Sequence, residues 1–184
     1  MIHINYIFRI ILIFENIYFM TDKKSWIGAG IIPIAVYNKQ LYVLLGKEAK
    51  GRDKGKYDAF GGGPNKEDKT PRDTALREGY EESMGFFGSL SYIQKNMKLL
   101  MPDLDTDFIL KIEYSPHTLP KLFNDVYKYM KSGVIKIKKG YFEKDSVRWF
   151  PVNKKQNINN FRSYFKKMFK YMIDNHDDIV KRCT

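Results

Sequence analysis

Three glutamates, Glu78, Glu81 and Glu82, are spaced so that a helix would carry them on one face. Carboxylates this close repel one another, which lowers stability unless a cation neutralises them. A hard divalent ion prefers oxygen ligands, and Mg²⁺ is the usual one where phosphates also bind. The triplet therefore predicts a metal site, with a solvated acidic helix face as the simpler alternative.

Glycines precede these glutamates and suit the same chemistry. Gly61, Gly62 and Gly63 follow a short strand-like segment, so the chain is expected to turn sharply there. A backbone without side chains can approach a metal or a phosphate closely, and a backbone carbonyl there could add a ligand. Arg77 stands next to Glu78 and can orient a carboxylate or shield the acidic cluster.

The segment from Gly61 to Gly85 resembles the Nudix box, G-x5-E-x7-R-E-U-x-E-E-x-G-U, where U is aliphatic. Gly63 matches the opening glycine, and the R-E-x-x-E-E core matches at Arg77, Glu78, Glu81 and Glu82. The resemblance implies an α/β fold, the Nudix-type α/β/α sandwich with a mixed β-sheet between helices. It also implies a pyrophosphohydrolase that uses Mg²⁺, or Mn²⁺ in its place. The flanking D-A-F-G-G-G and R-E-G-Y-E-E resemble uncharacterised Nudix proteins of large DNA viruses.

Three positions depart from the box. Lys69 stands where the first glutamate is expected, a residue that braces the helix through the arginine in the family; Asp68 or Glu67 could substitute. Gly79 replaces an aliphatic residue, at a helix cost of about 1 kcal/mol. Met84 occupies the closing glycine position, and Gly85 follows it. These changes keep open a catalytically weak or inactive Nudix-fold module that binds nucleotide or RNA.

The resemblance assigns roles to individual residues. A metal bound there would neutralise a diphosphate and lower the pKa of a bound water, and Glu78 or Glu82 would take the proton. Arg77 completes the expected catalytic set. Glu143, in a later loop, is a further carboxylate of the kind that family members add, with Asp145 as the fallback. The expected metal ligands are Glu78, Glu81, Glu82, Gly63 and Glu143.

Candidate substrate-binding residues lie outside the box. Arg52 and Lys54, with Lys47, could clamp phosphates from the basic loop 47–57, although such a loop is also simply soluble. The aromatic rings of Tyr57 and Trp149, and of Trp26, could stack on a base or belong to the core. Free nucleotides, dinucleoside polyphosphates and the mRNA cap all remain open as substrates.

Composition limits the class of protein only broadly. The 184 residues fit one domain, taken as 21–184, with a formal net charge of +11 that attracts polyanions such as nucleotides or RNA. An AT-rich coding bias would give a similar lysine content. A single cysteine excludes an internal disulfide, which favours a cytoplasmic protein, in the host cell if the chain is viral.

Residues 1–20 form an apolar extension that Arg9 and Glu15 interrupt. Its longest clean run, Ile10 to Phe14, is too short to span a bilayer, so no stable membrane insertion is expected. Three interpretations remain: a mis-assigned start with the true one at Met20, an added strand or helix, and a membrane-surface anchor.

Periodicity and turn residues predict the elements that must position these groups. Asn38-Lys39 is a tight turn between two strands, and Thr70-Pro71 starts the helix that carries the glutamates. The predicted strands are 26–37, 41–46, 107–114, 134–138 and 147–152, and the predicted helices are 70–84, 88–98, 119–130 and 161–173. Leu122, Val126, Tyr129 and Met130 are expected on one side of the third helix, and Phe161, Phe165, Met168, Phe169 and Met172 on one side of the last.

Overall fold

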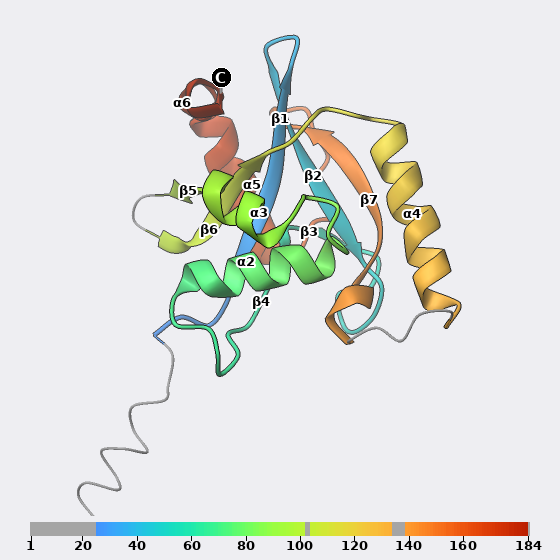
Figure 1. Ribbon diagram of the computed structural model, residues 1–184. Helices are drawn as coiled ribbons and strands as arrows, with labels where there is room; N and C mark the ends of the chain where they lie inside the picture. The colour runs from blue at the N-terminus through green and yellow to red at the C-terminus, as the bar shows by residue number, and fades with distance from the viewer. Residues whose placement is uncertain (1–24, 102–103, 134–138, 184) are drawn as a thin grey trace, which may run out of the picture.

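A mixed β-sheet forms the centre of the computed structural model, which describes residues 25–101, 104–133 and 139–183 (Figure 1). Seven strands take part, and the main path runs β3-β2-β1-β6-β5, while β4 pairs with β1 and β7 with β2. β1 and β6 are parallel and the other pairings are antiparallel. The strands are β1 (Ala29–Tyr37), β2 (Gln40–Glu48), β3 (Tyr57–Asp58), β4 (Phe60–Gly62), β5 (Lys98–Met101), β6 (Leu104–Lys111) and β7 (Lys144–Pro151).

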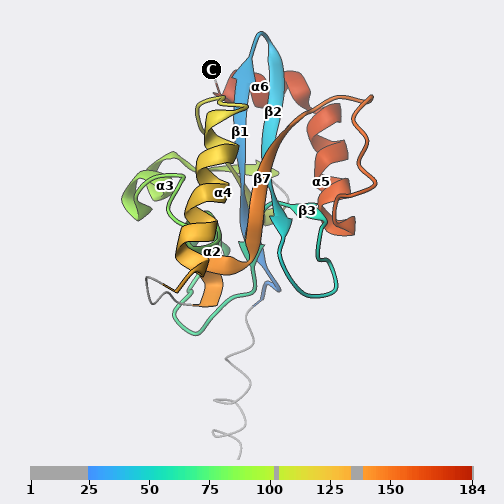
Figure 2. The same ribbon diagram turned by 90° about the vertical axis from the view of Figure 1, so that its right-hand side faces the viewer.

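Helices cover both faces of this sheet (Figures 1 and 2). One face packs against α2 (Pro71–Glu82), α3 (Leu90–Asn96) and α4 (Thr118–Lys131), and the other against α5 (Ser163–Asp174) and α6 (His176–Cys183). A short 3-10 helix, η1 (Lys139–Phe142), precedes β7. Each face has its own hydrophobic core, so the predicted α/β/α sandwich is confirmed.

The β1–β2 hairpin forms as the sequence predicts. Tyr37 pairs with Gln40, which leaves Asn38 and Lys39 as a two-residue turn. Their φ angles are 49° and 64°, the left-handed values that a type I′ turn requires at both central positions. Asn tolerates this conformation better than most residues, which explains why the turn falls there.

The predicted helices are present, but α4 turns a different side to the sheet. Phe123 and Tyr127 are its buried residues, whereas Leu122 is 49% and Tyr129 54% exposed. The predicted apolar side of this helix is therefore wrong for Leu122 and Tyr129, while the other two predicted residues, Val126 and Met130, are half-buried. The five residues predicted for the last helix, Phe161 and those that follow it in α5, are all buried.

The short elements β3, β4, β5, η1 and α6 are absent from the predicted strands and helices, and each has eight residues or fewer. The predicted strand 134–138 and the apolar extension 1–20 lie outside the described residues. Within the described ranges, no helix is both long enough and apolar enough to cross a membrane.

Candidate metal centre and substrate pocket

A capping box fixes the start of α2, the helix that carries the glutamates. The Thr70 hydroxyl accepts a hydrogen bond from the Asp73 N–H, and the Asp73 carboxylate accepts one from the Thr70 N–H. Pro71 follows as the first helical residue, where its missing N–H costs nothing. The predicted start is confirmed, and the helix direction at the glutamates is set by it.

The end of α2 explains one departure from the Nudix box. The Met84 N–H donates to the Glu81 carbonyl and the Gly85 N–H to the Tyr80 carbonyl, the pair of bonds that defines a Schellman motif. Met84 holds a φ of 54°, in the left-handed region where glycine is usual. The backbone thus keeps the turn that the closing glycine would make, with a methionine under strain in its place.

Gly79 also has a structural reason. A Cβ built there would lie 2.5 Å from Cδ1 of Ile31, which is fully buried in β1. The glycine lets α2 approach the sheet, and Ile31 fills the space that an aliphatic residue on the helix would occupy. The expected helix cost is therefore offset by closer packing.

Asp68 braces Arg77, so it replaces the first glutamate of the box. Its carboxylate is buried and accepts from Arg77 at 2.9 Å, from the Thr74 hydroxyl at 3.0 Å and from the Asn65 N–H at 2.9 Å. Lys69 and Glu67, its neighbours, are both exposed. Of the two substitutes that the sequence offered, the structure selects Asp68.

Arg77 connects this brace to the acidic cluster. Its guanidinium lies 2.7 Å from Glu78 Oε1 and 3.4 Å from Glu81 Oε2, and it donates to the Gly63 carbonyl at 2.9 Å. Burial opposes its charge, but Asp68 and Glu78 outweigh burial and raise the pKa of Arg77. Arg77 thus contacts the neighbouring carboxylates, and Glu78, Glu81 and Gly63 come together around it.

The other carboxylates of the site affect the pKa of Glu78. Burial raises its pKa, Arg77 opposes this rise, and the charges of Glu81 and Glu143 add to it. Glu143 itself pairs with Lys50 at 3.2 Å. Gly62 lies against Glu78, since a Cβ there would be 2.6 Å from Oε1. The predicted ligand Glu143 thus lies within electrostatic reach of the helix.

Glu82 lies in a different environment, because it points into the protein. It is 2% exposed, and its Oε2 accepts from the Gly61 N–H at 2.8 Å and lies 3.5 Å from the Lys144 ammonium. Lys144 is 1% exposed in its side chain and also binds Glu48 at 2.5 Å. Burial raises the pKa of Glu82 to about 8, against the opposing charge of Lys144. Only Oε1 of Glu82 is left for an external ligand.

The donor set suits a hard divalent cation. Every candidate ligand is a carboxylate or carbonyl oxygen, the chemistry that Mg²⁺ and Mn²⁺ take. In the described ranges, however, no three acidic, histidine or cysteine side chains already stand in metal-ligand geometry. Arg77 accounts for this, since it holds the Glu78 and Glu81 oxygens that a cation would take. The residues have the ligand chemistry that the metal requires, and a bound metal would replace the hydrogen bonds of Arg77 to the Glu78 and Glu81 oxygens.

The sharp turn predicted at Gly61–Gly63 is wrong, because Gly61 and Gly62 belong to β4 and pair with Gly30 and Ala29 of β1. A cavity of about 510 Å³ borders this glycine segment on the side of α5. Gly61, Gly62 and Gly63 form one wall, and Arg162, Tyr164 and Asp107 line it from α5 and β6. Asp107 is 3% exposed, and one of its oxygens, Oδ2, accepts from Tyr164 and Thr106. No described residue donates to its other oxygen. A buried carboxylate therefore keeps one acceptor for a ligand in this cavity.

The predicted substrate residues lie in two places. Arg52 and Lys54 are exposed in the loop between β2 and β3. The Trp149 ring packs in the core and donates to the Ser115 carbonyl, while Tyr57 packs edge-on against Phe150. Trp26 donates to the Thr74 hydroxyl. The structure thus gives the three aromatic rings packing roles.

Several residues of the site were not predicted from the sequence. Lys144, Glu48 and Asp58 form a buried charged cluster with Arg162, which lies 2.8 Å from Asp58. The residues that meet there are 96 and 104 positions apart along the chain. The one available signal was weak: Asp107 is a charged residue at the start of the predicted strand 107–114, where a buried charge needs a partner.

No family model matches the sequence, and no curated protein matches it significantly. Solved structures similar to the chain are Nudix proteins. A MutT/nudix family protein from Enterococcus faecalis shares 19% identity over 75% of this chain and 49% of its own, with a TM-score of 0.43. The NUDIX domain of Shewanella oneidensis NrtR, crystallised with ADP ribose, shares 15% identity over 71% and 75%, with a TM-score of 0.42.

A third neighbour is a bifunctional NMN adenylyltransferase/ADP ribose pyrophosphatase from Francisella tularensis, complexed with AMP and a Mn ion. It shares 12% identity over 96% of this chain and 47% of its own, with a TM-score of 0.36. The chain thus spans about half the length of the Enterococcus and Francisella proteins. The structural neighbours of this α/β/α sandwich are Nudix family proteins, the same family that the Gly63–Glu82 motif resembles.

Proposed function

We propose that the chain is a Nudix hydrolase that cleaves a phosphoanhydride in a nucleoside diphosphate linked to another moiety. The observation that carries this proposal is that the Arg77 guanidinium donates to Glu78, to Glu81 and to the Gly63 carbonyl, and so holds these oxygens close together. Gly63 and the preceding glycines also wall a cavity of about 510 Å³, which is large enough for a nucleotide. An acidic cluster beside a glycine-lined cavity suits a phosphoanhydride substrate that binds together with a metal ion.

Glu78, Glu81 and Glu82 would hold the metal, with Glu143 and the Gly63 carbonyl as further ligands. Bound Mg²⁺ or Mn²⁺ would neutralise the diphosphate and lower the pKa of a bound water. Glu78 is better placed than Glu82 to take a proton from water, because Glu82 is 2% exposed and held by Gly61 and Lys144. Asp68 would keep the arginine in place while the carboxylates change partner.

The far end of the substrate would lie against Asp107. Its free carboxylate oxygen can accept from an N–H of a base or from a sugar hydroxyl. Arg52 and Lys54 remain candidates for binding the outer phosphates. Both side chains are exposed, and both residues come only a few positions before Asp58, which lines the cavity. Free nucleotides, dinucleoside polyphosphates and capped RNA are the substrate classes to compare.

The test is a turnover assay with Mg²⁺ or Mn²⁺ on capped RNA, dinucleoside polyphosphates, nucleotide sugars and oxidised nucleotides. On the best substrate, Glu78→Gln and Glu81→Gln are expected to lower kcat at least about 100-fold through lost metal ligands. Glu67→Gln is the matched control, since Glu67 is exposed and its neighbour Asp68 makes the brace. Asp107→Asn should raise KM more than it lowers kcat.

Metal-dependent turnover that Glu78→Gln and Glu81→Gln leave intact would overturn the assigned site. Absence of turnover on every substrate, with nucleotide binding retained, would replace the enzyme by the nucleotide-binding or RNA-binding module.

A further inference from the structure

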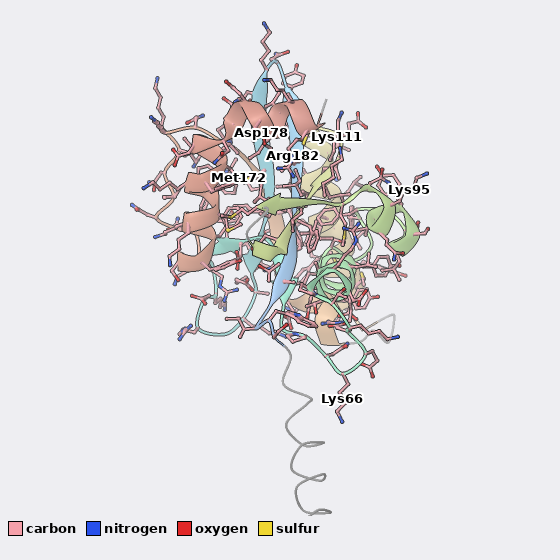
Figure 3. The ribbon with its side chains drawn as sticks, turned by 90° about the vertical axis from the view of Figure 1, so that its left-hand side faces the viewer. Lys66, Lys95, Lys111, Met172, Asp178 and Arg182 are labelled. Atoms are coloured by element: carbon pink, nitrogen blue, oxygen red, sulfur yellow. The ribbon has the colours of Figure 1, made fainter. Side chains whose placement is uncertain are left out.

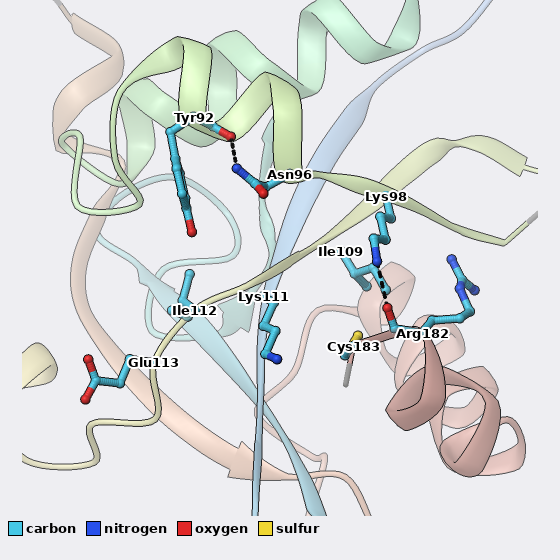
Figure 4. Close-up of a pocket in the computed structure, with 9 residues that line it drawn as sticks. All are labelled: Tyr92, Asn96, Lys98, Ile109, Lys111, Ile112, Glu113, Arg182 and Cys183. Atoms are coloured by element: carbon cyan, nitrogen blue, oxygen red, sulfur yellow. Dashed lines mark hydrogen bonds between the residues drawn. The ribbon is translucent and has the colours of Figure 1, made fainter.

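A second cavity, of about 530 Å³, lies at the other end of β6 (Figure 4). Four elements meet around it: α3, β5, the end of β6 and α6. It shares no lining residue with the cavity beside Gly61–Gly63. Its polar lining includes Tyr92, Asn96, Lys98, Lys111, Glu113 and Arg182.

Positive charge dominates this cavity. Lys98, Lys111 and Arg182 line it against a single acidic residue, Glu113. All three cations act on the Cys183 thiol, whose pKa burial raises and their charges lower. Charges that converge on one buried atom from three elements create a local positive potential, which attracts an anion.

The three cations differ in how they are held. Arg182 donates to the Leu99 and Leu100 carbonyls, and Lys98 donates to the Arg182 carbonyl at 2.8 Å (Figure 4). The Lys111 side chain is exposed and forms neither a hydrogen bond nor an ion pair with any described residue. Lys111 is therefore the cation most free to bind a ligand. Lys98 is held by one carbonyl and can still meet a phosphate, whereas Arg182, which also lies 3.7 Å from Asp178, forms a fixed positive wall.

The strand edge beside Lys111 is also open. β5 pairs with β6 only as far as Lys98 opposite Ile109, whereas β1 continues alongside to Ile34 opposite Lys111. In the described ranges no strand covers the outer edge of β6 beyond Ile109. Ile109, Lys111 and Ile112 on that edge line the cavity, and the N–H and C=O groups of an uncovered strand edge can bond a polar ligand.

An aromatic ring completes the lining. Tyr92 is 47% exposed and projects from α3 toward Ile112 (Figure 4). The Asn96 amide donates to the Tyr92 carbonyl at 2.7 Å, and the ring lies over Gly88, where a Cβ would come within 2.9 Å. The ring thus has Gly88 behind it and remains largely accessible from the cavity, as a stacking platform for a base requires.

We propose that this cavity binds a segment of single-stranded RNA, with phosphates on Lys111 and Lys98 and a base on Tyr92. A backbone anion beside an aromatic platform is the pattern that suits a nucleic-acid strand. An acidic peptide would use the cations but would not need the ring. The assignment is independent of the hydrolase proposal, because it concerns a separate cavity.

Fluorescence anisotropy with a labelled ten-nucleotide uridine RNA tests the proposal on the full chain, in EDTA so that metal-dependent cleavage cannot occur. Lys111→Glu is expected to weaken binding about tenfold and to reduce the salt slope by about 1 or more. Tyr92→Leu should weaken binding about fivefold or more. Thermal melting checks that each variant is folded.

Lys66→Glu is the matched control, since it makes the same charge change on an exposed lysine far from the cavity (Figure 3). The proposal predicts little effect there. Equal losses for Lys66→Glu and Lys111→Glu would overturn it in favour of general attraction to a basic protein. A labelled poly-glutamate peptide that binds as tightly as the RNA, with RNA binding unchanged in Tyr92→Leu, would overturn the nucleic-acid assignment in favour of acidic peptide.

Discussion

Two environments share one helix in this protein. Glu78 and Glu81 lie half-buried around Arg77, where their partners can change, whereas Glu82, one residue on from Glu81, is enclosed with Lys144 and Glu48. Of the three glutamates, two therefore pair with Arg77 near the surface and the third pairs with the buried Lys144. The division teaches that equal spacing on a helix does not give carboxylates equal roles, because the layer beneath the helix decides which can meet a ligand.

The largest expected effect comes from removing the buried cation. Lys144→Met should lower the free energy of unfolding by about 3–5 kcal/mol, because Glu48 and Glu82 would remain buried without their partner. Urea unfolding followed by circular dichroism measures this. Lys56→Met, which removes an exposed pair with Asp53, should leave stability nearly unchanged. A similar loss of unfolding free energy in both variants would show that the buried ion pairs of Lys144 contribute no more to stability than an exposed ion pair.

The distance between helix and sheet maintains the enclosed side. Gly79→Ala should destabilise by about 1–3 kcal/mol, since the new methyl group would meet Ile31, and this exceeds the gain in helix propensity. Ile31→Val removes the atom that is met, so the double variant should recover part of the loss. Unfolding free energies of the four proteins give the coupling. If the effects of the two substitutions on the unfolding free energy were additive, the contact between the new methyl group and Ile31 would not be the cause of the loss.

The surface side depends on Asp68. Asp68→Ala should cost about 1–3 kcal/mol, because the Arg77 guanidinium and the Thr74 hydroxyl would lose a buried charged acceptor. Arg77 would then be positioned only by Glu78, Glu81 and the Gly63 carbonyl, so turnover should also fall. Thermal melting and the hydrolysis assay report the two effects separately. A fall in stability with unchanged kcat would mean that the brace serves the fold only.

The smallest effect is a gain. Met84→Gly should stabilise the protein by about 0.5–1 kcal/mol, since glycine adopts the left-handed backbone at the helix end without strain. Lys39→Gly, in the β1–β2 turn with a φ of 64°, should give a similar gain and serves as the comparison. Differential scanning calorimetry resolves shifts of this size. Loss of stability in Met84→Gly alone would show that the Met84 side chain contributes more packing than its backbone costs.

Local chemistry explains what the sequence could predict. Thr70-Pro71, the turn at Asn38-Lys39 and the apolar face of α5 depend on neighbours within a few residues, and all three are confirmed. The α/β/α sandwich followed from the box and is also confirmed. The bonding of Arg77 to Glu78 and Glu81 could be expected from their adjacency on one helix.

Long-range packing explains the rest. The side of α4 that is buried depends on β7, and spacing alone admitted either Leu122 or Phe123 as the inward residue. The partner of Glu82 lies on a strand that starts 62 positions later, and Lys144 gives no sign in the sequence that it is buried. Asp107 likewise becomes a site residue only because β6 lies parallel to β1.

The enclosure of Lys144 makes it an internal reporter of local opening. Burial alone would lower its pKa, but Glu82 and Glu48 outweigh this and raise it, so the amine is both inaccessible and protonated. Acylating reagents attack only the exposed, deprotonated amine. Lys144 should therefore be acylated far later than exposed lysines such as Lys66, and its rate, followed by mass spectrometry, would time how often the sheet opens beneath α2.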